Sequence, residues 1–361
     1  SSKWKASCIA NRRAYIGNVQ IFYENGDKKI AQDKMIRSLP NKFDIFPISE
    51  SVDVAINDGE EIIALVEFND RILQFKERTL YVINASQDIE FLEDKLDYRG
   101  ITHKASVIKT EYGIVWANKN GCYYYDGTKV NDLLQKQGRP LIKQDIWETF
   151  IGTPLVGYSP KKKQIIVVDD IGTAKDGHAY IYDMITTSWV KAVGVFPDTA
   201  KTNFTIDFNG DLIYSSHDGS STSLLKKWTD TATQTLPKIR IKDLDFGAPS
   251  QKKSVKKVYL TFKGDASDIE IYYGIDGLEP SSLTFNRITS GTDGSTNNAD
   301  HSTASKCIPF DAGDTDWLCA ELKPSAGSVT CNSFSILIDG TAGTDFEIND
   351  ISVVYRPKTI K

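Results

Sequence analysis

The clearest hydrophobic pattern in the chain lies in residues 64–83, ALVEFNDRILQFKERTLYVI. Three short apolar runs are separated by two polar turns, NDR at 69–71 and KER at 76–78. Asn and Asp suit such turns because their side chains bond to nearby backbone and tolerate left-handed conformations, whereas β-branched and aromatic residues fill the pleated faces. The pattern therefore predicts a three-stranded antiparallel meander.

The same alternation of apolar runs and polar turns recurs through the first 232 residues. The groups occupy residues 7–21, 64–83, 113–130, 156–190 and 204–228, and a short alternating strand at 52–56 precedes the second group. They start roughly 40 to 55 residues apart, a spacing expected of β-propeller blades. We predict a β-propeller-like domain of about five blades. A multi-hairpin β protein of another kind is the alternative, because the landmark dipeptides of WD repeats are absent.

Two stretches of this first domain depart from the strand pattern. Residues 28–46 are irregular and contain Pro40, so we expect a connecting segment with one helical turn. Between residues 133 and 150, apolar side chains lie about one helical turn apart and predict a short helix. These side chains are Ile142, Ile146, Trp147 and Phe150.

A change in composition near residue 229 marks a second domain, which we place at residues 233–361. Residues 229–237 form a Thr-rich linker, and residues 290–305 form a long polar loop that we expect to be exposed. Short alternating strands predict a β-sandwich of the jelly-roll type. They are expected at residues 238–244, 255–262, 269–273, 307–310, 317–322, 333–338 and 348–355. The fold class is thus all-β.

Composition and charge narrow the function classes. The chain has 361 residues, a net charge of -5 and a pI near 5.5, so its surface as a whole does not predict nucleic-acid binding. A wall that merely encloses DNA is a different case, since a neutral or acidic wall avoids tight binding of a sliding polyanion. A DNA conduit therefore stays open as a function.

The cysteines, the apolar runs and the start of the sequence give little information about chemistry. Five cysteines without a C-x-x-C pair argue against a disulfide framework, so we expect reduced thiols. No signal peptide is recognisable, and no apolar run approaches the roughly 20 residues that span a bilayer. The sequence starts without Met and enters a strand pattern at once, so we expect an N-terminal portion to precede it.

No motif predicts a catalytic, cofactor or metal site, and we predict a protein that is not an enzyme. Residues 216–219, SHDG, resemble only part of the sialidase box. Asp169 and Asp170 point to opposite faces of a strand, whereas glycoside hydrolysis needs two carboxylates across one bond. The acidic loop at 311–316 lacks the spacing of an EF-hand, so a polar turn is favoured over a calcium site.

Two other groups of residues have both a functional and a structural interpretation. The four His residues have no metal-ligand spacing, and most of the six Trp residues lie in apolar strand patterns that indicate packing. The densest basic cluster is a candidate contact with DNA phosphates or an acidic subunit. Protection of an edge strand by lysine is the alternative. This cluster comprises Lys252, Lys253, Lys256 and Lys257.

Several long phrases resemble the tail nozzle and DNA-stabilisation proteins of short-tailed bacteriophages. Residues 68–83, 156–170 and 179–191 resemble their propeller part, and residues 242–262 and 345–358 resemble their C-terminal sandwich. The resemblance implies a structural subunit of a ring in the virion, expected to be six-fold, below the portal. It implies contacts with the portal or adaptor ring, with tail fibres and, transiently, with viral DNA during genome ejection, after synthesis in the host cytoplasm.

Two other functions stay open. The chain could be a secreted or virion-surface glycan-binding protein, for which an aromatic platform on the sandwich would be needed. It could also be a propeller glycosidase, which would require convergent acidic residues in a pocket. Fold analogy by itself decides between none of these.

Overall fold

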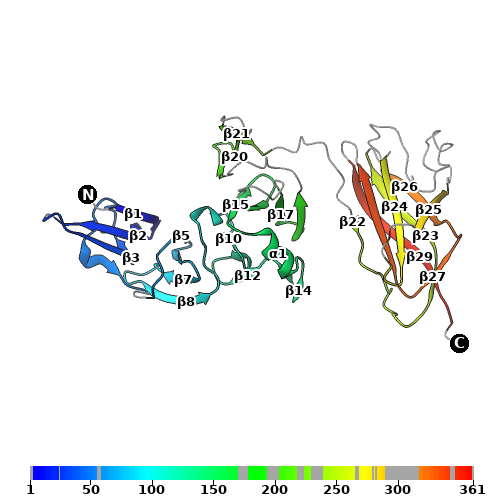
Figure 1. Cartoon of the computed structure of the whole chain (residues 1–361), viewed down its shortest axis with the longest axis horizontal. Helices are drawn as coiled ribbons and strands as arrows, with labels where there is room; N and C mark the ends of the chain where they lie inside the picture. The colour runs from blue at the N-terminus through cyan, green and yellow to red at the C-terminus, as the bar shows by residue number, and fades with distance from the viewer. Residues whose placement is uncertain are drawn as a thin grey trace. The chain divides into compact units, whose positions relative to one another are not determined.

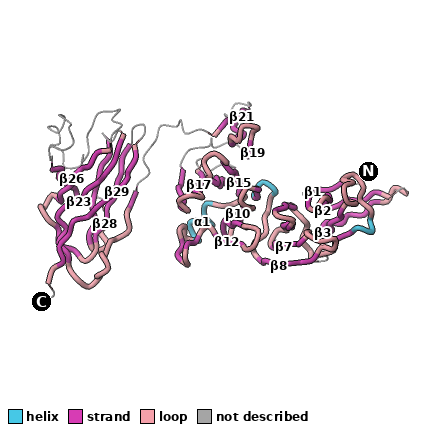
Figure 2. The backbone as a smooth tube through the Cα atoms, turned by 180° about the vertical axis from the view of Figure 1, so that it is seen from behind, coloured by secondary structure: helices cyan, strands magenta, loops and turns pink. Residues whose placement is uncertain are grey.

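The computed structural model describes residues 3–23, 25–54, 58–169, 178–192, 203–217, 223–228, 239–264, 268–278, 280, 283–288, 317–341 and 346–359. Strands dominate these residues, as Figures 1 and 2 show from opposite sides. The chain divides into two compact units, Ser1–Trp228 and Thr229–Lys361. The boundary expected after residue 232 lies outside the described residues. Among the described helices, none is long and apolar enough to cross a membrane.

In the described residues, the first unit contains five antiparallel sheets of three or four strands that follow one another along the chain (Figure 1). We number them sheets 1 to 5 in chain order. Sheet 1 has β1 (Lys3–Ala10), β2 (Arg13–Phe22), β3 (Lys28–Arg37) and β4 (Ser51–Val52); sheet 2 has β5 (Ala64–Phe68), β6 (Arg71–Phe75), β7 (Thr79–Asn84) and β8 (Phe91–Asp97); sheet 3 has β9 (Val107–Lys109), β10 (Ile114–Asn118), β11 (Gly121–Tyr125) and β12 (Val130–Asp132); sheet 4 has β15 (Pro154–Ser159), β16 (Gln164–Asp169), β17 (Ala179–Asp183) and β18 (Ser188–Ala192); sheet 5 has β19 (Phe204–Ile206), β20 (Leu212–His217) and β21 (Ser223–Lys227).

Shorter elements connect these sheets. They are the 3-10 helices η1 (Ile48–Glu50) and η2 (Lys104–Ser106), the hairpin of β13 (Gln135–Lys136) and β14 (Arg139–Pro140), and the helix α1 (Gln144–Phe150). The helix confirms the prediction from apolar spacing, with Trp147 and Phe150 buried and Ile146 exposed. Trp147 packs beside Tyr180 and Trp189 of sheet 4, and its Nε1–H donates to the Asn118 carbonyl of sheet 3 at 2.9 Å. The helix therefore joins sheets 3 and 4.

The sheets pack face to face through four apolar clusters, one at each junction. Successive side chains of a strand point to opposite faces, so a central strand supplies two clusters at once. In β16, Ile165 and Val167 join the cluster with sheet 3, whereas Ile166 and Val168 join the cluster with sheet 5. Central strands are apolar on both faces for this reason, and the arrangement is propeller-like. In the described residues, no core cluster joins sheet 1 to sheet 5.

One prediction for this unit was wrong. Residues 28–46 were expected to form a connecting segment, but residues 28–37 form the ten-residue strand β3, whose mixed polar sequence hides its pairing with β2. The three-stranded meander predicted at residues 64–83 is confirmed by β5, β6 and β7, and the same sheet has a fourth strand, β8, that was not predicted. That strand was missed because all its residues except Leu96 are exposed, so it lacks an alternating apolar face.

The second unit is a β-sandwich, as predicted. Its strands are β22 (Ile239–Arg240), β23 (Lys253–Lys263), β24 (Asp268–Ile275), β25 (Leu283–Ile288), β26 (Leu318–Pro324), β27 (Val329–Cys331), β28 (Phe334–Thr341) and β29 (Glu347–Pro357). Strand β25 pairs with β24 on one side and with β26 on the other, so it links the two halves of the sandwich. Phe262, Tyr273, Phe285 and Phe334 lie in one core cluster between those halves. The linker at 229–237, the polar loop at 290–305 and the strand expected at 307–310 lie outside the described residues.

Candidate functional site

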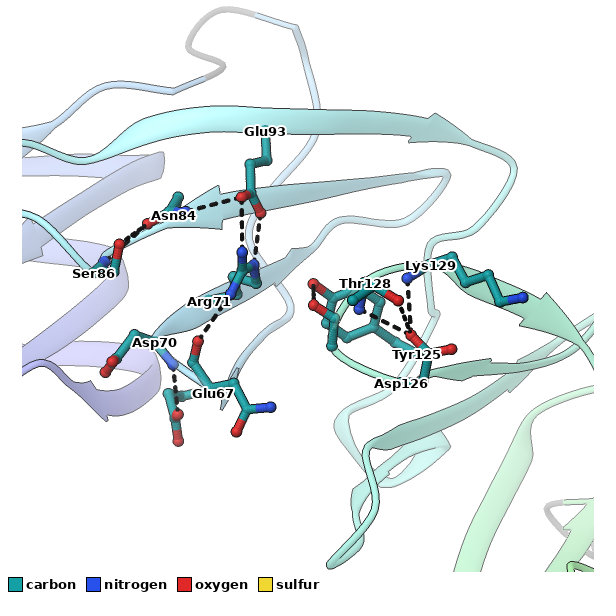
Figure 3. A network of polar contacts seen from close by, with 12 residues as sticks. Glu67, Asp70, Arg71, Asn84, Ser86, Glu93, Tyr125, Asp126, Thr128 and Lys129 are labelled. Carbon is teal, nitrogen blue, oxygen red and sulfur yellow. Dashed lines mark hydrogen bonds and ion pairs between the residues drawn. The ribbon is translucent and has the colours of Figure 1, made fainter.

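A polar cleft opens between sheets 2 and 3, at the edge of their shared apolar cluster. Its volume is about 340 Å³. One wall belongs to β6, β7 and β8, and the other belongs to the turn between β11 and β12 (Figure 3). The lining residues are Arg71, Val82, Glu93, Asp94, Leu96, Tyr125, Gly127, Thr128, Lys129 and Val130. Because it combines both charges with an apolar floor, this cleft is the candidate site of the first unit.

A β-bulge in β8 determines which side chains reach the cleft. Val82 pairs with Asp94 and Ile83 pairs with Leu92, so Glu93 is an extra residue without a partner on β7. A bulge interrupts the alternation of a strand and can redirect a side chain. As a result, Glu93 and Asp94 both line the cleft, although neighbouring residues of a regular strand point to opposite faces.

Glu93 is the centre of a hydrogen-bond network on the first wall. Arg71 donates from Nε to Glu93 Oε2 at 2.9 Å and from Nη2 to Oε1 at 3.1 Å, and Asn84 Nδ2 donates to Oε1 at 2.8 Å (Figure 3). The bond from Arg71 is the main cause that lowers the pKa of Glu93, and the same bond raises the pKa of Arg71. Glu93 therefore stays ionised at neutral pH and cannot be the proton donor that glycoside hydrolysis requires.

The second wall is a turn organised by Asp126. Its Oδ1 accepts the backbone N–H groups of Thr128 and Lys129, each at 2.9 Å, and the Thr128 hydroxyl at 2.7 Å. Burial by itself would raise the pKa of Asp126, but these bonds outweigh it and lower the pKa to about 2. Gly127 has a φ of 96°, which favours glycine, and a Cβ there would lie 3.1 Å from Asn69 Nδ2 of sheet 2.

Asp94 and Lys129 supply the charges that a ligand could neutralise. Within the described residues, neither side chain makes an ion pair, whereas Arg71 and Glu93 neutralise each other. Oδ1 of Asp94 accepts the N–H of Lys95 at 2.8 Å. The cleft can thus accept a positively charged group at Asp94. In the described part of the chain, no cluster of His, Cys, Asp or Glu is arranged to hold a metal ion.

The turn at residues 126–127 was predicted from the sequence, whereas the cleft was not. The available signal was the acidic segment EFLEDKLD, residues 90–97, directly after a clear strand. Nothing in that segment indicates a bulge, so the joint orientation of Glu93 and Asp94 could not be predicted.

The four lysines of the predicted basic cluster lie in different environments. Lys252 and Lys256 are exposed at the start of β23. Lys257 is half-buried and pairs with Glu321 at 2.8 Å. Lys253 is buried, and its Nζ donates to the carbonyls of Ala248 and Asn332.

A bulge in β23 explains the directions in which Lys256 and Lys257 point. The register shifts between Val255 and Lys257, so Lys256 and Lys257 both point away from the core while Lys253 points toward it. Lys253 therefore has a structural role and cannot join an exposed basic surface. Only Lys252 and Lys256 present exposed ammonium groups, and a contact with DNA or an acidic subunit stays a prediction for them.

The other residues considered for chemistry have structural surroundings where they are described. Asp169 is buried, and its Oδ1 accepts the N–H groups of Gly152 at 2.6 Å and Thr153 at 2.7 Å. His103 accepts the N–H of Ala105 at the start of η2. Asp170, residues 218–219 of the SHDG sequence and the acidic loop at 311–316 lie outside the described residues.

The tryptophans divide into packing residues and exposed residues. Trp116 and Trp147 are fully buried, which confirms the packing interpretation for these two. Trp4 of sheet 1 and Trp317 of the sandwich are each 49% exposed. Trp317 lies under the ammonium of Lys263, which is 5.3 Å from its ring centroid, and about half of the residue stays exposed on the sandwich.

Comparison with known proteins gives structural likeness only. No protein family and no curated protein matches the chain. The extracellular domain of a one-component system from B. thetaiotaomicron shares 12% identity, with 65% of this chain and 35% of that chain covered and a TM-score of 0.36. A protein from Lactobacillus plantarum shares 11% identity, with 62% and 70% covered and a TM-score of 0.37. These likenesses carry no argument about activity or partners.

Proposed function

We propose that this chain is a non-catalytic structural subunit of a bacteriophage tail, where it forms part of the channel for genome delivery. In this proposal it assembles as a homo-oligomeric ring, with six subunits as the expected number, and belongs to the nozzle or the head-to-tail stabilisation ring. Its partners would be the portal or adaptor ring, the tail fibres and, transiently, the viral DNA.

The observation that supports a mechanical role is the packing of the five sheets. Sheets 2, 3 and 4 each bury both faces against neighbours, through the four clusters that contain Ile72, Leu73, Ile165 and Ile166, respectively. Closely packed interiors of this kind have low compressibility. A stack of such sheets would resist deformation as a channel wall must. The resemblance of the sequence to tail nozzle proteins supplies the kind of channel.

The charge of the chain is compatible with passing DNA. A net charge of -5 gives little general attraction for phosphates, so it would not hold a moving polyanion. Lys252 and Lys256 offer local positive charge on the sandwich. In this proposal they would contact an acidic neighbouring subunit or the DNA backbone.

The mass of the native particle tests this function. Light scattering of the purified chain and electron microscopy of the assembly from its source should reveal a ring, with density beneath a portal. A stable monomer that never joins a particle would refute the proposal. A double variant, Lys252→Glu with Lys256→Glu, should then weaken ring assembly or DNA retention while leaving the sandwich folded.

A glycan-binding role is the second candidate, favoured by Trp317. Its ring is half exposed on the sandwich, beside Lys263, whose ammonium also pairs with Glu347 at 3.1 Å. An open aromatic face next to fixed polar groups is a surface on which a sugar ring can stack. A glycan array probed with the wild-type chain and with Trp317→Ala tests this role. Binding that the substitution leaves unchanged would exclude Trp317 as the platform.

A further inference from the structure

Strand β8 is an exposed sheet edge in the first unit. It has seven residues, whereas the last described strands of the other four sheets, β4, β12, β18 and β21, have two, three, five and five. It pairs with β7 on one side, and in the described part of the chain no strand pairs with its other side. An open edge of this length is a template for another strand. The amide of Lys95 already donates to the Asp94 side chain instead of a neighbouring strand.

Apolar side chains accompany this open edge. Phe91 and Leu92 are 45% and 43% exposed, and Ile89 just before them is 78% exposed. Natural edge strands are commonly protected by short length or by lysine, and β8 has Lys95 as its one lysine. The combination of a free backbone edge with exposed apolar side chains favours a partner that is itself an extended strand.

The charge around β8 selects the kind of strand. Residues 87–97 contain five carboxylates and a single ammonium, that of Lys95. Glu90 and Glu93 are neutralised by Arg37 and Arg71, respectively. Asp88 and Asp94 make no ion pair within the described residues, and Asp97 has only Lys95, at 3.4 Å. The edge that remains is acidic, so it complements a basic segment and repels an acidic one.

We propose that β8 and the adjoining cleft form a docking site for an extended, basic peptide segment of a partner protein. The segment adds as a strand to the open edge of β8, and one of its Lys or Arg side chains enters the cleft to pair with Asp94. Alternate residues of a strand point to opposite faces, so a segment that alternates basic and apolar residues fits. Its basic residues meet the cleft, and its apolar residues meet Leu92 on the opposite face. This inference does not depend on the proposed tail function.

The bulge at Glu93 is what makes the cleft suitable as an anchor. It brings Glu93 and Asp94 to one wall, and Arg71 neutralises the first while the second stays available. Without the bulge the two carboxylates would point to opposite faces, and the docking strand would meet a single charge on each. The pairing of Glu93 with Arg71 thus directs an incoming cation to Asp94.

The probe for this site is a labelled peptide as long as β8, with alternating Lys and Val and with blocked ends. Binding to the full chain is measured by fluorescence anisotropy at low and at high salt. Hydrogen exchange of the chain, with and without the peptide, locates the contact. We expect binding that weakens with salt, together with added protection of the backbone amides in residues 91–97.

Three comparisons make the test specific. A peptide with N-methyl groups on alternate residues has the same charge but cannot pair as a strand, so it should lose binding. A Glu-Val peptide should not bind. Asp94→Asn should weaken binding about three- to fivefold, as expected for a partly exposed ion pair. Asp145→Asn, which removes an exposed carboxylate from α1, is the matched control and should leave binding unchanged.

Several results would overturn the proposal. Equal binding of the N-methylated peptide would exclude strand addition, and equal affinity in Asp94→Asn would exclude the cleft as the anchor. Protection confined to residues outside β8 would place the contact elsewhere. Protection of β8 that rises with the concentration of the chain, without peptide, would identify a second copy as the occupant instead.

Discussion

Replacement of Trp147 by alanine tests whether the helix α1 holds the sheet stack together. The side chain is fully buried between sheets 3 and 4, where Tyr180 and Trp189 lie with ring centroids 5.9 Å away. Its Nε1–H donates to the Asn118 carbonyl at 2.9 Å. The substitution therefore removes apolar contacts and a hydrogen bond from the same junction.

The expected loss of stability follows from these two contributions. Truncation of a buried Trp to Ala typically costs about 3 to 5 kcal/mol. The Asn118 carbonyl is only partly buried, so the loss of its donor adds about 1 kcal/mol, the low end of the range for an unsatisfied acceptor. We expect a total of about 4 to 6 kcal/mol, which approaches the whole unfolding free energy of many domains. Trp147→Phe keeps most of the apolar contact and should cost about 1 to 3 kcal/mol.

Urea unfolding followed by circular dichroism measures these changes, with hydrogen exchange to assign each transition to one unit. The transition of residues 1–228 should move to lower urea, and the transition of the sandwich should stay in place. Trp4→Ala is the control, since Trp4 is 49% exposed and its loss should cost less than about 1 kcal/mol. Equal effects of the two alanine variants would refute the role assigned to the helix.

Three other substitutions test separate parts of the structure. Gly157→Ala should lower the unfolding free energy by about 1 to 3 kcal/mol and weaken the packing of sheet 5, because the new Cβ would lie 2.6 Å from the Phe204 ring. Hydrogen exchange of the β20 amides measures this effect. Phe204→Leu in the same chain should restore their protection. Asp126 has a pKa of about 2 in the folded chain and about 3.9 in the unfolded chain, so its stabilising contribution is complete above about pH 4 and is lost as the pH falls to about 2. Urea midpoints measured across this pH range should therefore vary less in Asp126→Asn than in the wild-type chain. A pH profile that the substitution leaves unchanged would contradict the assignment. Lys253→Ala should destabilise the sandwich by about 2 to 4 kcal/mol, because the ammonium of Lys253 satisfies two backbone carbonyls. Lys252→Ala, at an exposed position, should change the thermal midpoint little. Similar effects of the two substitutions would show that Lys253 is not buried.

The central strands could be predicted from the sequence because each carries its own signal. Strands such as β6, β10 and β16 bury both faces, so most of their residues are apolar, whereas the turns that flank them are polar. The helix α1 was predictable for a related reason, since its buried Trp147 and Phe150 lie about one turn apart. The all-β class and the change of architecture near residue 229 follow from the same local patterns.

The edge strands were harder to predict from the sequence, because an edge strand contributes little to a core. The sequence of β8 has no buried alternate face, and β3 carries more polar than apolar residues. Both segments are strands because their backbones form hydrogen bonds with partner strands, and their own side chains give little indication of that pairing. Pairing between segments therefore decided these elements.

The sequence by itself determined which stretches of this protein are buried strands, where its turns lie and where one architecture ends. Only the tertiary structure decided which charges remain available. Two bulges, at Glu93 and near Lys256, shift the alternation of their strands by one residue. One of them brings Asp94 and Glu93 to a single wall, and the other turns Lys257 off the core face, so that Lys253 is the one buried lysine of the four. A bulge depends on hydrogen bonds to a distant strand, so no local pattern of residues reveals it.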